Sequence, residues 1–334
     1  MRGGGSKMGV GKAIFIIPYF GHFNNYFQLF LNSCAYNRDF DWLIFTDDQT
    51  NYKYPHNVRV EYCSFQDIQN KFREKFDFNI SLERPYKLCD FKPAYGYIFY
   101  DKIQQYDFWG HCDTDLIWGK IGDFITDDLL EKNDKIGIMG HCTLYRNTPE
   151  NNSIFLKKLN GIDRAKEVFQ STYNYSFDEE FNLSINNLFE EYNKKIDYTE
   201  YEANIYTKSS DFKITKMDIN TKKYFIEKRK RSFFVWDRGK LLRYSYVNEK
   251  IKTEEYMYIH MQSREMKIKN SSFEIYKIIP NAFENIEVSA PIEKNFFNVK
   301  IKNFNLHYFK LRSHNLVDKL KKKFQKICSK EKGV

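Results

Sequence analysis

Two aspartates separated by one residue are the strongest chemical signal in this 334-residue chain. Asp113 and Asp115 follow the aromatic and apolar segment 108–112, which is typical of a buried strand. Two carboxylates at this spacing can face one divalent cation, and Mg²⁺ and Mn²⁺ favour oxygen ligands together with substrate phosphates. A second such pair, Asp39 and Asp41, we interpret as solvated loop residues. By spacing alone, Asp113 and Asp115 are either a metal site for a diphosphate or a structural acidic turn.

A repeated Gly-His-Cys triplet, at 110–112 and 140–142, raises the question of a zinc site. Adjacent residues of a strand point to opposite faces, so the His and Cys of one triplet cannot easily bind the same ion. We therefore favour two strands of a central sheet, with His111 and His141 near the binding crevice. Arg146, four residues further on, either contacts a bound ligand or forms a structural ion pair.

The elements that must position these residues follow an α/β pattern. Continuous apolar runs predict buried parallel strands, and apolar residues at helical spacing lie between the first two runs, as in a βαβ unit. A further helix is expected after Pro93, because proline suits the first turn of a helix. The predicted strands are 13–18, 42–46, 106–112 and 135–139, and the helix between the first two is 26–36.

Polar residues cluster where these strands end. In open α/β sheets ligands bind beyond the carboxyl ends of the strands, so residues 19–21, 47–48 and 113–115 are expected to converge on one crevice. The later part of the chain, which has no glycine between Gly161 and Gly239, shows helical spacing at 162–171 and 179–195, and strand-like segments at 232–236 and 256–259.

The composition, 42% hydrophobic and 18% aromatic, excludes a disordered protein, and the longest apolar run is too short to span a bilayer. The net charge of +9 belongs to the end of the chain, because residues 298–334 hold 11 Lys or Arg and two acids. Residues 313–327 are spaced as a basic amphipathic helix. Such a helix either docks on the core or lies on an anionic membrane surface. Without a recognisable module, a nucleic-acid partner is not expected.

Four motifs resemble a family of bacterial glycosyltransferases from capsule and O-antigen gene clusters. They are PYFG at 18–21, FTD at 45–47, KLCDFKP at 87–93 and, above all, FWGHCDTDLIWG at 108–119. The resemblance runs from about residue 13 to 270. It implies a GT-A-like, Rossmann-type central mixed sheet flanked by helices, with a helical acceptor-side region and the basic tail beyond it. It also favours the metal interpretation of the acidic pair.

The resemblance implies roles for particular side chains. Asp113 and Asp115 would hold Mn²⁺ or Mg²⁺ against the diphosphate of a nucleotide sugar, and His260, after a late strand, would be a third ligand, although a lone histidine is often structural. Surface solvation is the alternative for Lys87 and Lys92. The implied donor-binding residues are Pro18, Tyr19, Phe20, Gly21, Asp47, Lys87, Asp90 and Lys92, and His141 and Arg146 would contact donor or acceptor.

A sugar hydroxyl that attacks with inversion of configuration needs a base for its proton. Asp178 and Glu179 are the candidates, and the alternative is that they are acids favoured at a helix start. A retaining enzyme would need no such base, and the resemblance favours inversion.

The sequence thus predicts a glycosyltransferase that depends on a divalent metal. It would transfer a sugar from a nucleotide-sugar donor, expected to be UDP-linked, to a lipid-linked oligosaccharide. The expected location is cytoplasmic, peripheral on the inner face of the cytoplasmic membrane. We expect a leader at 1–8, a donor-binding half at 9–150, an acceptor-side half at 151–270 and an extension at 271–334. The alternatives are a non-catalytic carbohydrate-binding protein at the membrane surface and a phosphatase of the haloacid dehalogenase type, whose Asp-x-Asp would include a nucleophile.

Overall fold

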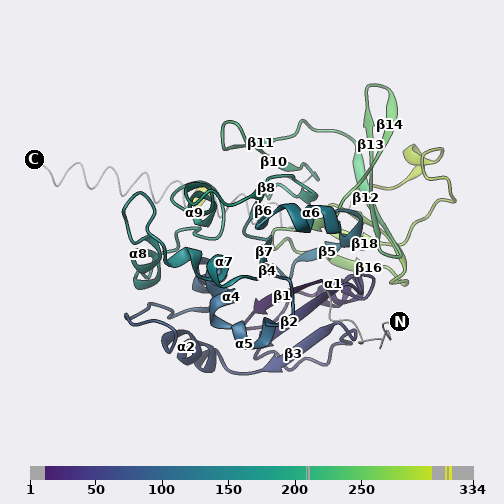
Figure 1. The fold of residues 1–334 in the computed structure, drawn as a ribbon. Helices are drawn as coiled ribbons and strands as arrows, with labels where there is room; N and C mark the ends of the chain where they lie inside the picture. Colours follow the sequence, from purple (N-terminus) through teal and green to yellow (C-terminus); the bar gives the residue numbers. More distant parts are fainter. Residues whose placement is uncertain (1–11, 208, 210, 303–312, 314–315, 318–334) are drawn as a thin grey trace, which may run out of the picture.

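The computed structural model describes residues 12–207, 209, 211–302, 313 and 316–317. Its centre is a seven-stranded sheet in the order β3-β2-β1-β4-β7-β6-β8 (Figure 1). The strand β7 runs antiparallel to both of its neighbours, and the other pairs in this sheet are parallel. The predicted α/β class with a central mixed sheet is therefore confirmed. The strands are β1 (Ala13–Pro18), β2 (Phe40–Thr46), β3 (Val58–Tyr62), β4 (Phe108–Cys112), β6 (Lys135–Met139), β7 (Cys142–Arg146) and β8 (Ile196–Asp197).

Both faces of this sheet are covered, which explains why its strands read as continuous apolar runs. Ile14 and Ile16 of β1 pack in one core cluster with most of the helices, while Phe15 and Ile17 pack in another with α1. The expected βαβ unit is present. The helices are α1 (Phe27–Cys34), α2 (Phe65–Arg73), α3 (Leu88–Phe91), α4 (Tyr95–Ile98), α5 (Tyr100–Ile103), α6 (Asp127–Lys132), α7 (Pro149–Ser153), α8 (Arg164–Gln170) and α9 (Ile185–Glu191), with 3₁₀ turns at Pro85–Lys87, Lys92–Ala94, Ile121–Asp123, Ile154–Leu156 and Phe296–Asn298.

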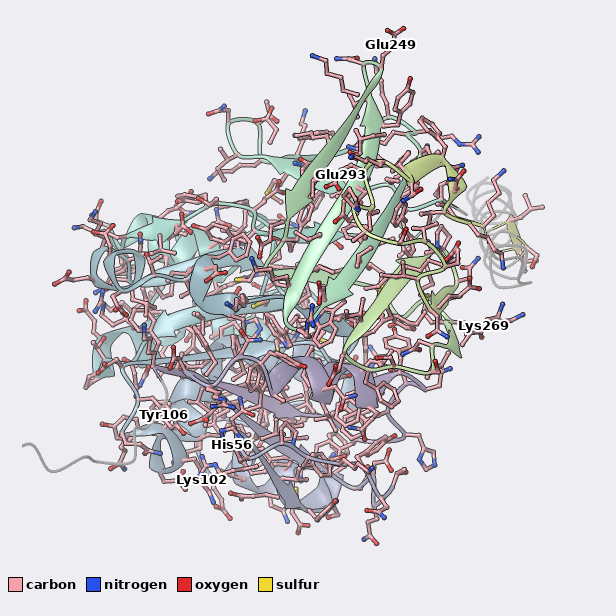
Figure 2. All side chains as sticks on the ribbon, turned by 90° about the vertical axis from the view of Figure 1, so that its right-hand side faces the viewer. His56, Lys102, Tyr106, Glu249, Lys269 and Glu293 are labelled. Carbon is pink, nitrogen blue, oxygen red and sulfur yellow. The ribbon has the colours of Figure 1, made fainter. Side chains whose placement is uncertain are left out.

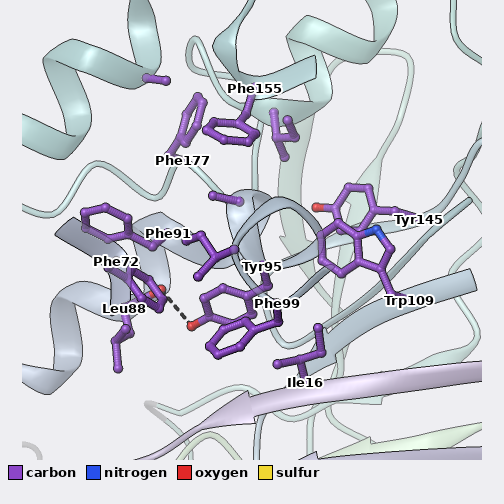
Figure 3. Packing of buried hydrophobic residues seen from close by; sticks show 14 of the residues in the cluster. Ile16, Phe72, Leu88, Phe91, Tyr95, Phe99, Trp109, Tyr145, Phe155 and Phe177 are labelled. Atoms are coloured by element: carbon purple, nitrogen blue, oxygen red, sulfur yellow. Dashed lines mark hydrogen bonds between the residues drawn. The ribbon is translucent and has the colours of Figure 1, made fainter. Parts of the chain in front are cut away.

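The helix expected after Pro93 is present but broken into short pieces. Residues 92–94 form a 3₁₀ turn between α3 and α4. Proline has no backbone N–H to donate, so the turn tightens at that point. The Tyr95 hydroxyl donates to the Leu88 carbonyl at 3.1 Å and bridges the break (Figure 3). As Figure 3 shows, rings of Phe91, Tyr95 and Phe99 fill the space above Ile16, and this packing sets where the preceding residues Lys87 to Lys92 lie.

A second, six-stranded sheet in the order β14-β13-β12-β17-β18-β16 lies beside the first. Its β13–β14 hairpin projects from the molecule, with Glu249 at the tip, far from His56 and Lys102 (Figure 2). Because β17 pairs with β12, the boundary expected at residue 270 falls inside this sheet. The strands are β12 (Ser232–Asp237), β13 (Lys240–Val247), β14 (Lys250–Glu255), β16 (Lys267–Lys269), β17 (Ile275–Ile279) and β18 (Ala282–Glu284).

Two small sheets complete the fold. In the first, β5 (Leu116–Trp118) pairs with β15 (Tyr258–His260), which also pairs with β9 (Glu202–Asn204). This pairing brings the late strand β15 next to the segment that follows Asp115. The second is the hairpin of β10 (Thr215–Asp218) and β11 (Lys223–Ile226).

The second half of the chain is less helical than its sequence indicated. The helix expected at 162–171 is α8, but α9 begins only after Ser184, whose side chain accepts from the Asn186 N–H as its N-cap. Beyond α9 the described chain is mainly strands, held by pairing with distant segments. The leader at 1–8 and nearly all of the basic helix at 313–327 lie outside the described residues. Among the described helices, none has the length and apolarity needed to cross a bilayer.

Candidate active site

A cavity of about 1020 Å³ opens at the carboxyl ends of β1 and β4. Pro18, Tyr19 and Phe20 line one wall, and the segment from Asp113 to Asp115 lines another. The loops after β1 and β4 therefore converge as expected. Further lining residues come from the turn before β7, the segment before α9, and β9, β10, β11 and β15.

Asp47, at the end of β2, supports this wall from behind and is not among the lining residues. Its Oδ1 accepts from the Gly21 N–H at 2.7 Å. Gly21 has a φ of +99°, a conformation that favours glycine. Asp48 likewise accepts from the Phe23 N–H at 3.0 Å. Gly21 is not a lining residue either, so these contacts give Asp47 and Gly21 a role in shaping a loop whose residues Tyr19, Phe20, His22 and Asn24 line the cavity.

Asp113, Asp115 and His260 form a compact cluster inside the cavity. One potential ligand atom from each lies within 4.8 Å of the others. His260 Nε2 is 3.3 Å from Asp115 Oδ1 and 3.8 Å from Asp113 Oδ2. Within the described part of the chain, no other group of three or more His, Cys, Asp or Glu side chains is arranged in this way. The three residues could hold a divalent metal ion.

The surroundings orient His260 as a ligand. Its Nδ1 lies 3.2 Å from the Asn204 side-chain oxygen, which accepts a hydrogen bond from Nδ1, and its Nε2 faces the carboxylates and would bind a metal ion once it has lost its own proton. Burial disfavours the charged imidazole, but Asp115 outweighs this effect and raises the pKa of His260. Burial also opposes the charged carboxylate of Asp115, yet His260 and a hydrogen bond from the Ser263 N–H lower its pKa. The two carboxylates supply oxygen ligands, which suit Mn²⁺ or Mg²⁺.

Lys92 connects this cluster to a second acidic group. Its ammonium donates to Asp113 Oδ1 at 2.8 Å and to the Gly140 carbonyl at 2.7 Å, and it lies 3.4 Å from Asp178 Oδ2. The Lys92 side chain is only 10% exposed. The surface-solvation alternative for Lys92 is therefore wrong.

Asp178 and Glu179 lie in the cavity wall ahead of α9, so they are not helix-start acids. Glu179 Oε2 accepts from the Gly140 N–H at 3.1 Å. Burial raises the pKa of Asp178 to about 7, although Lys92 acts in the opposite direction. Burial also raises the pKa of Glu179, with Gly140 opposing it. Carboxyl groups with raised pKa values are suited to accept or donate protons near neutral pH.

Lys87 and Asp90 form a buried pair beneath the cavity. Lys87 Nζ is 2.8 Å from Asp90 Oδ2, and neither side chain is more than 2% exposed. Asp90 also accepts from the backbone N–H groups of Tyr175 and Phe177, each at 3.1 Å. Lys87 is therefore not solvated at the surface, and it does not line the cavity. Asp90 lines the cavity, but both oxygens of its carboxylate already accept hydrogen bonds from the protein. The pair shapes the segment that leads to Asp178.

His141 lines the cavity, and its ring centroid lies 4.3 Å from that of His260. The Tyr258 hydroxyl lies 2.9 Å from His141 Nδ1, and His141 Nε2 has no protein partner. His111 also lines the cavity. Neither histidine joins a zinc-like cluster among the described residues.

Arg146 is directed away from the cavity. Its guanidinium donates to the backbone carbonyls of Glu131 and Asn133, and its Nε lies 3.9 Å from Asp134. Of the two alternatives for Arg146, the structural ion pair is the one observed.

Sequence reasoning missed Asn204, Tyr86 and Tyr224, which also line the cavity. Asn204 is opposite His260 in the β9–β15 register, which only strand pairing reveals. For Tyr86 and Tyr224 the sequence offers one signal, an aromatic residue beside polar residues in a short segment. Because this chain has 25 tyrosines, that signal could not single out these two.

The comparisons with known proteins give a family and a set of structural likenesses. No curated protein has a significantly similar sequence. The galactosyltransferase LgtC, crystallised with donor and acceptor sugar analogues, is 11% identical and covers 58% of this chain and 75% of its own, with a TM-score of 0.32. The apo form of the glycosyltransferase GlyE from Streptococcus pneumoniae TIGR4 is 13% identical and covers 58% of this chain and 46% of its own, also with a TM-score of 0.32.

A family model matches residues 15–287, which include most of β1 and the strands β17 and β18 beyond residue 270. This span contains every residue of the cavity described above. The chain therefore belongs to the DUF6625 family, which is described as a family of unknown function.

Proposed function

We propose that this protein is a metal-dependent glycosyltransferase with a GT-A-like active site. Its donor is a nucleotide sugar in which the sugar is linked to UDP. The observation that carries the proposal is the Asp113–Asp115–His260 cluster inside a cavity of about 1020 Å³. The cavity is large enough for a nucleotide sugar and part of an acceptor. A divalent ion, when bound there, would stabilise the charge that develops on the leaving diphosphate.

The other cavity residues have roles in the proposal. Pro18, Tyr19 and Phe20 would contact the nucleoside, since they line the wall at the end of β1. Lys92 would keep Asp113 and Asp178 in place through its two contacts. Glu179 would accept the proton of the acceptor hydroxyl. At the same time the hydroxyl oxygen would bond to the anomeric carbon, and the bond between that carbon and the diphosphate would break. Inversion of configuration follows from this single displacement.

The basic end of the chain supports a proposal about the acceptor. Residues 298–334 carry 11 basic and two acidic side chains, and each basic residue near an anionic membrane adds about 1 kcal/mol of attraction. We propose that the enzyme works at the inner face of the cytoplasmic membrane and that its acceptor is a lipid-linked oligosaccharide for bacterial surface polysaccharide.

The test is hydrolysis and transfer with a panel of radiolabelled nucleotide sugars in the presence of Mn²⁺. We expect one donor to be consumed, and Asp115→Asn to reduce its consumption by at least about 100-fold, since removing a metal ligand or its partner costs on this scale. Asp39→Asn is the matched control and should retain activity, because Asp39 is exposed. The interpretation of its neighbour Asp41 as a solvated loop residue is wrong, since Asp41 is half-buried in β2 and accepts from the Tyr106 hydroxyl at 2.6 Å. Normal turnover by the Asp115 variant would contradict the mechanism, and NMR of the product's anomeric configuration decides between inversion and retention.

A further inference from the structure

Two tyrosines on the rim of the cavity expose large aromatic surfaces that the fold does not use. Tyr86, in the 3₁₀ turn at 85–87, is 70% exposed, and Tyr224, in β11, is 41% exposed. Both line the cavity, although they come from elements 138 positions apart in the chain. Exposed aromatic rings at a concave site are characteristic of ligand contact.

The Tyr224 side chain and the Tyr86 backbone are both held by other residues of the rim. The Tyr224 hydroxyl donates to the sulfur of Met139 at 3.6 Å, at the end of β6. On the other side, Asn174 donates to the Tyr86 carbonyl at 3.3 Å, and Arg84 donates to the Asn174 side-chain oxygen at 2.6 Å. A ligand that stacks on the Tyr224 ring therefore costs little ordering of that side chain, and the backbone that carries Tyr86 is already fixed.

The charge around these rings restricts what they can bind. The cavity wall also contains Asp178, Glu179 and Glu180. Glu179 lines the cavity together with both tyrosines, and its charge is among the causes that raise their pKa values, after burial for Tyr224 and after Cys89 and burial for Tyr86. Negative charge here disfavours a phosphate and favours a neutral ligand that donates hydrogen bonds.

The backbone at this place is also strained. Ser176 and Glu180 both line the cavity and have φ values of +51° and +60°, in the left-handed region that non-glycine residues rarely adopt. Such strain gathers where side chains must be aimed at a ligand. Asn174 and Thr215 add polar groups to the same rim.

From this combination we infer that Tyr86 and Tyr224 form a subsite for a neutral pyranose ring at the cavity rim. The apolar C–H face of the sugar packs on the aromatic faces, which are electron-rich, and its hydroxyl groups donate to Glu179, Glu180 and Asn174. The inference deepens the proposed function, on which it rests, by assigning a carbohydrate class to the acceptor and a location to its ring.

The experiment is saturation-transfer NMR with the full chain, without metal or donor, and the methyl β-glycopyranosides of glucose, galactose and N-acetylglucosamine. We expect transfer to the ring C–H protons of at least one glycoside, and a decrease of about five- to tenfold in affinity for Tyr86→Ala, in line with the value of one aromatic contact. Tyr86→Phe and Tyr224→Phe keep the rings and should keep most of the signal.

Tyr173→Ala is the matched control, because Tyr173 is 75% exposed in the neighbouring segment and is not a lining residue. It should leave the signal unchanged. No transfer to any of the three glycosides, or equal signals from wild type and Tyr86→Ala, would overturn the subsite. Donor hydrolysis with Mn²⁺ is measured separately: hydrolysis without glycoside binding rejects only the subsite, and binding without hydrolysis of any donor rejects only the transferase.

Discussion

The ammonium of Lys92 lies 2.8 Å from a carboxylate oxygen of Asp113, so one aspartate of the candidate metal cluster is held by a buried lysine. The same ammonium lies 3.4 Å from Asp178. The metal cluster and the acidic pair in the opposite wall are thus parts of one electrostatic network, and a change at Lys92 affects both.

Lys92→Met is expected to lower the free energy of unfolding by about 3 kcal/mol, because Asp113 and Asp178 lose the buried ammonium that they share and Asp178 must take up a proton. Urea denaturation measures this. Lys102→Met breaks a pair with Glu61 in which both side chains are at least one third exposed, and it should cost less than about 1 kcal/mol. Equal losses from the two substitutions would show that the Lys92 network contributes nothing beyond a surface pair.

His260→Gln is expected to weaken Mn²⁺ binding by about tenfold or more, because it removes the single nitrogen ligand of the cluster. Isothermal titration calorimetry on the metal-free protein measures it, and EDTA should abolish donor hydrolysis by the wild type. His22→Gln is the control, since the His22 side chain is 93% exposed and outside the cluster. Unchanged Mn²⁺ affinity of the His260 variant would remove this residue from the ligand set.

Gly140→Ala tests the tight contact between the turn before β7 and the acidic pair. A Cβ at Gly140 would lie 2.4 Å from Asp178 Oδ2 and 3.0 Å from Glu179 Oε2, so both carboxylates must move. We expect transfer to fall by about 100-fold, since small displacements of catalytic groups cost this much, while Mn²⁺ affinity is retained. In Gly122→Ala the added methyl meets nothing within 4 Å, and transfer should persist. Full activity of the Gly140 variant would exclude a positioned acidic pair.

Lys135 makes stability depend on pH. Burial lowers its pKa from 10.5 to about 7, although Asp178 opposes the shift. Between pH 7 and 10 the unfolded chain therefore binds more protons than the folded chain, so the contribution of Lys135 to stability rises with pH. Relative to Lys135→Met, the wild type should gain on the order of 3 kcal/mol across this range.

Chemical denaturation at several pH values measures that gain. The control is Lys132→Met, because the Lys132 side chain is 67% exposed, and its difference from the wild type should stay constant with pH. A constant difference for Lys135→Met as well would mean that the buried lysine keeps its ordinary pKa.

Deletion of residues 313–334 is expected to weaken sedimentation with liposomes that contain anionic lipids, because it removes seven lysines of the basic end. Donor hydrolysis should persist, since the cavity lies within residues 16–263. Higher salt should weaken the binding of the intact chain, and neutral liposomes should sediment little of it. If the truncated chain sediments as well as the intact one, the membrane role of this segment is refuted.

Much of the central sheet could be predicted because its information is local. The apolar runs of β1 and β2 indicate strands that are buried on both faces. The position of Asp113 directly after β4 follows from the same pattern. The general rule that ligands bind beyond strand ends then predicted the crevice. The resemblance of the motifs to glycosyltransferases, and not the spacing, pointed to His260.

Other features depended on distant parts of the chain. Lys87 and Lys92 belong to one short motif, yet the first is buried beneath the cavity with Asp90 and the second reaches Asp113. Local sequence cannot distinguish the two lysines, because their different partners depend on how the broken helix packs, with Phe91 and Tyr95 against Phe72.

The sequence by itself determined the α/β class, the acidic pair after a strand and the basic end of the chain, because strand periodicity, spacing and charge are properties of neighbouring residues. Only the tertiary structure decided that His260 faces Asp115, that Arg146 is directed away from the cavity, and that Tyr86 and Tyr224 share a rim. The physical reason is that these relationships arise from strand pairing and core packing between segments far apart in the chain, where many small contacts together choose one arrangement.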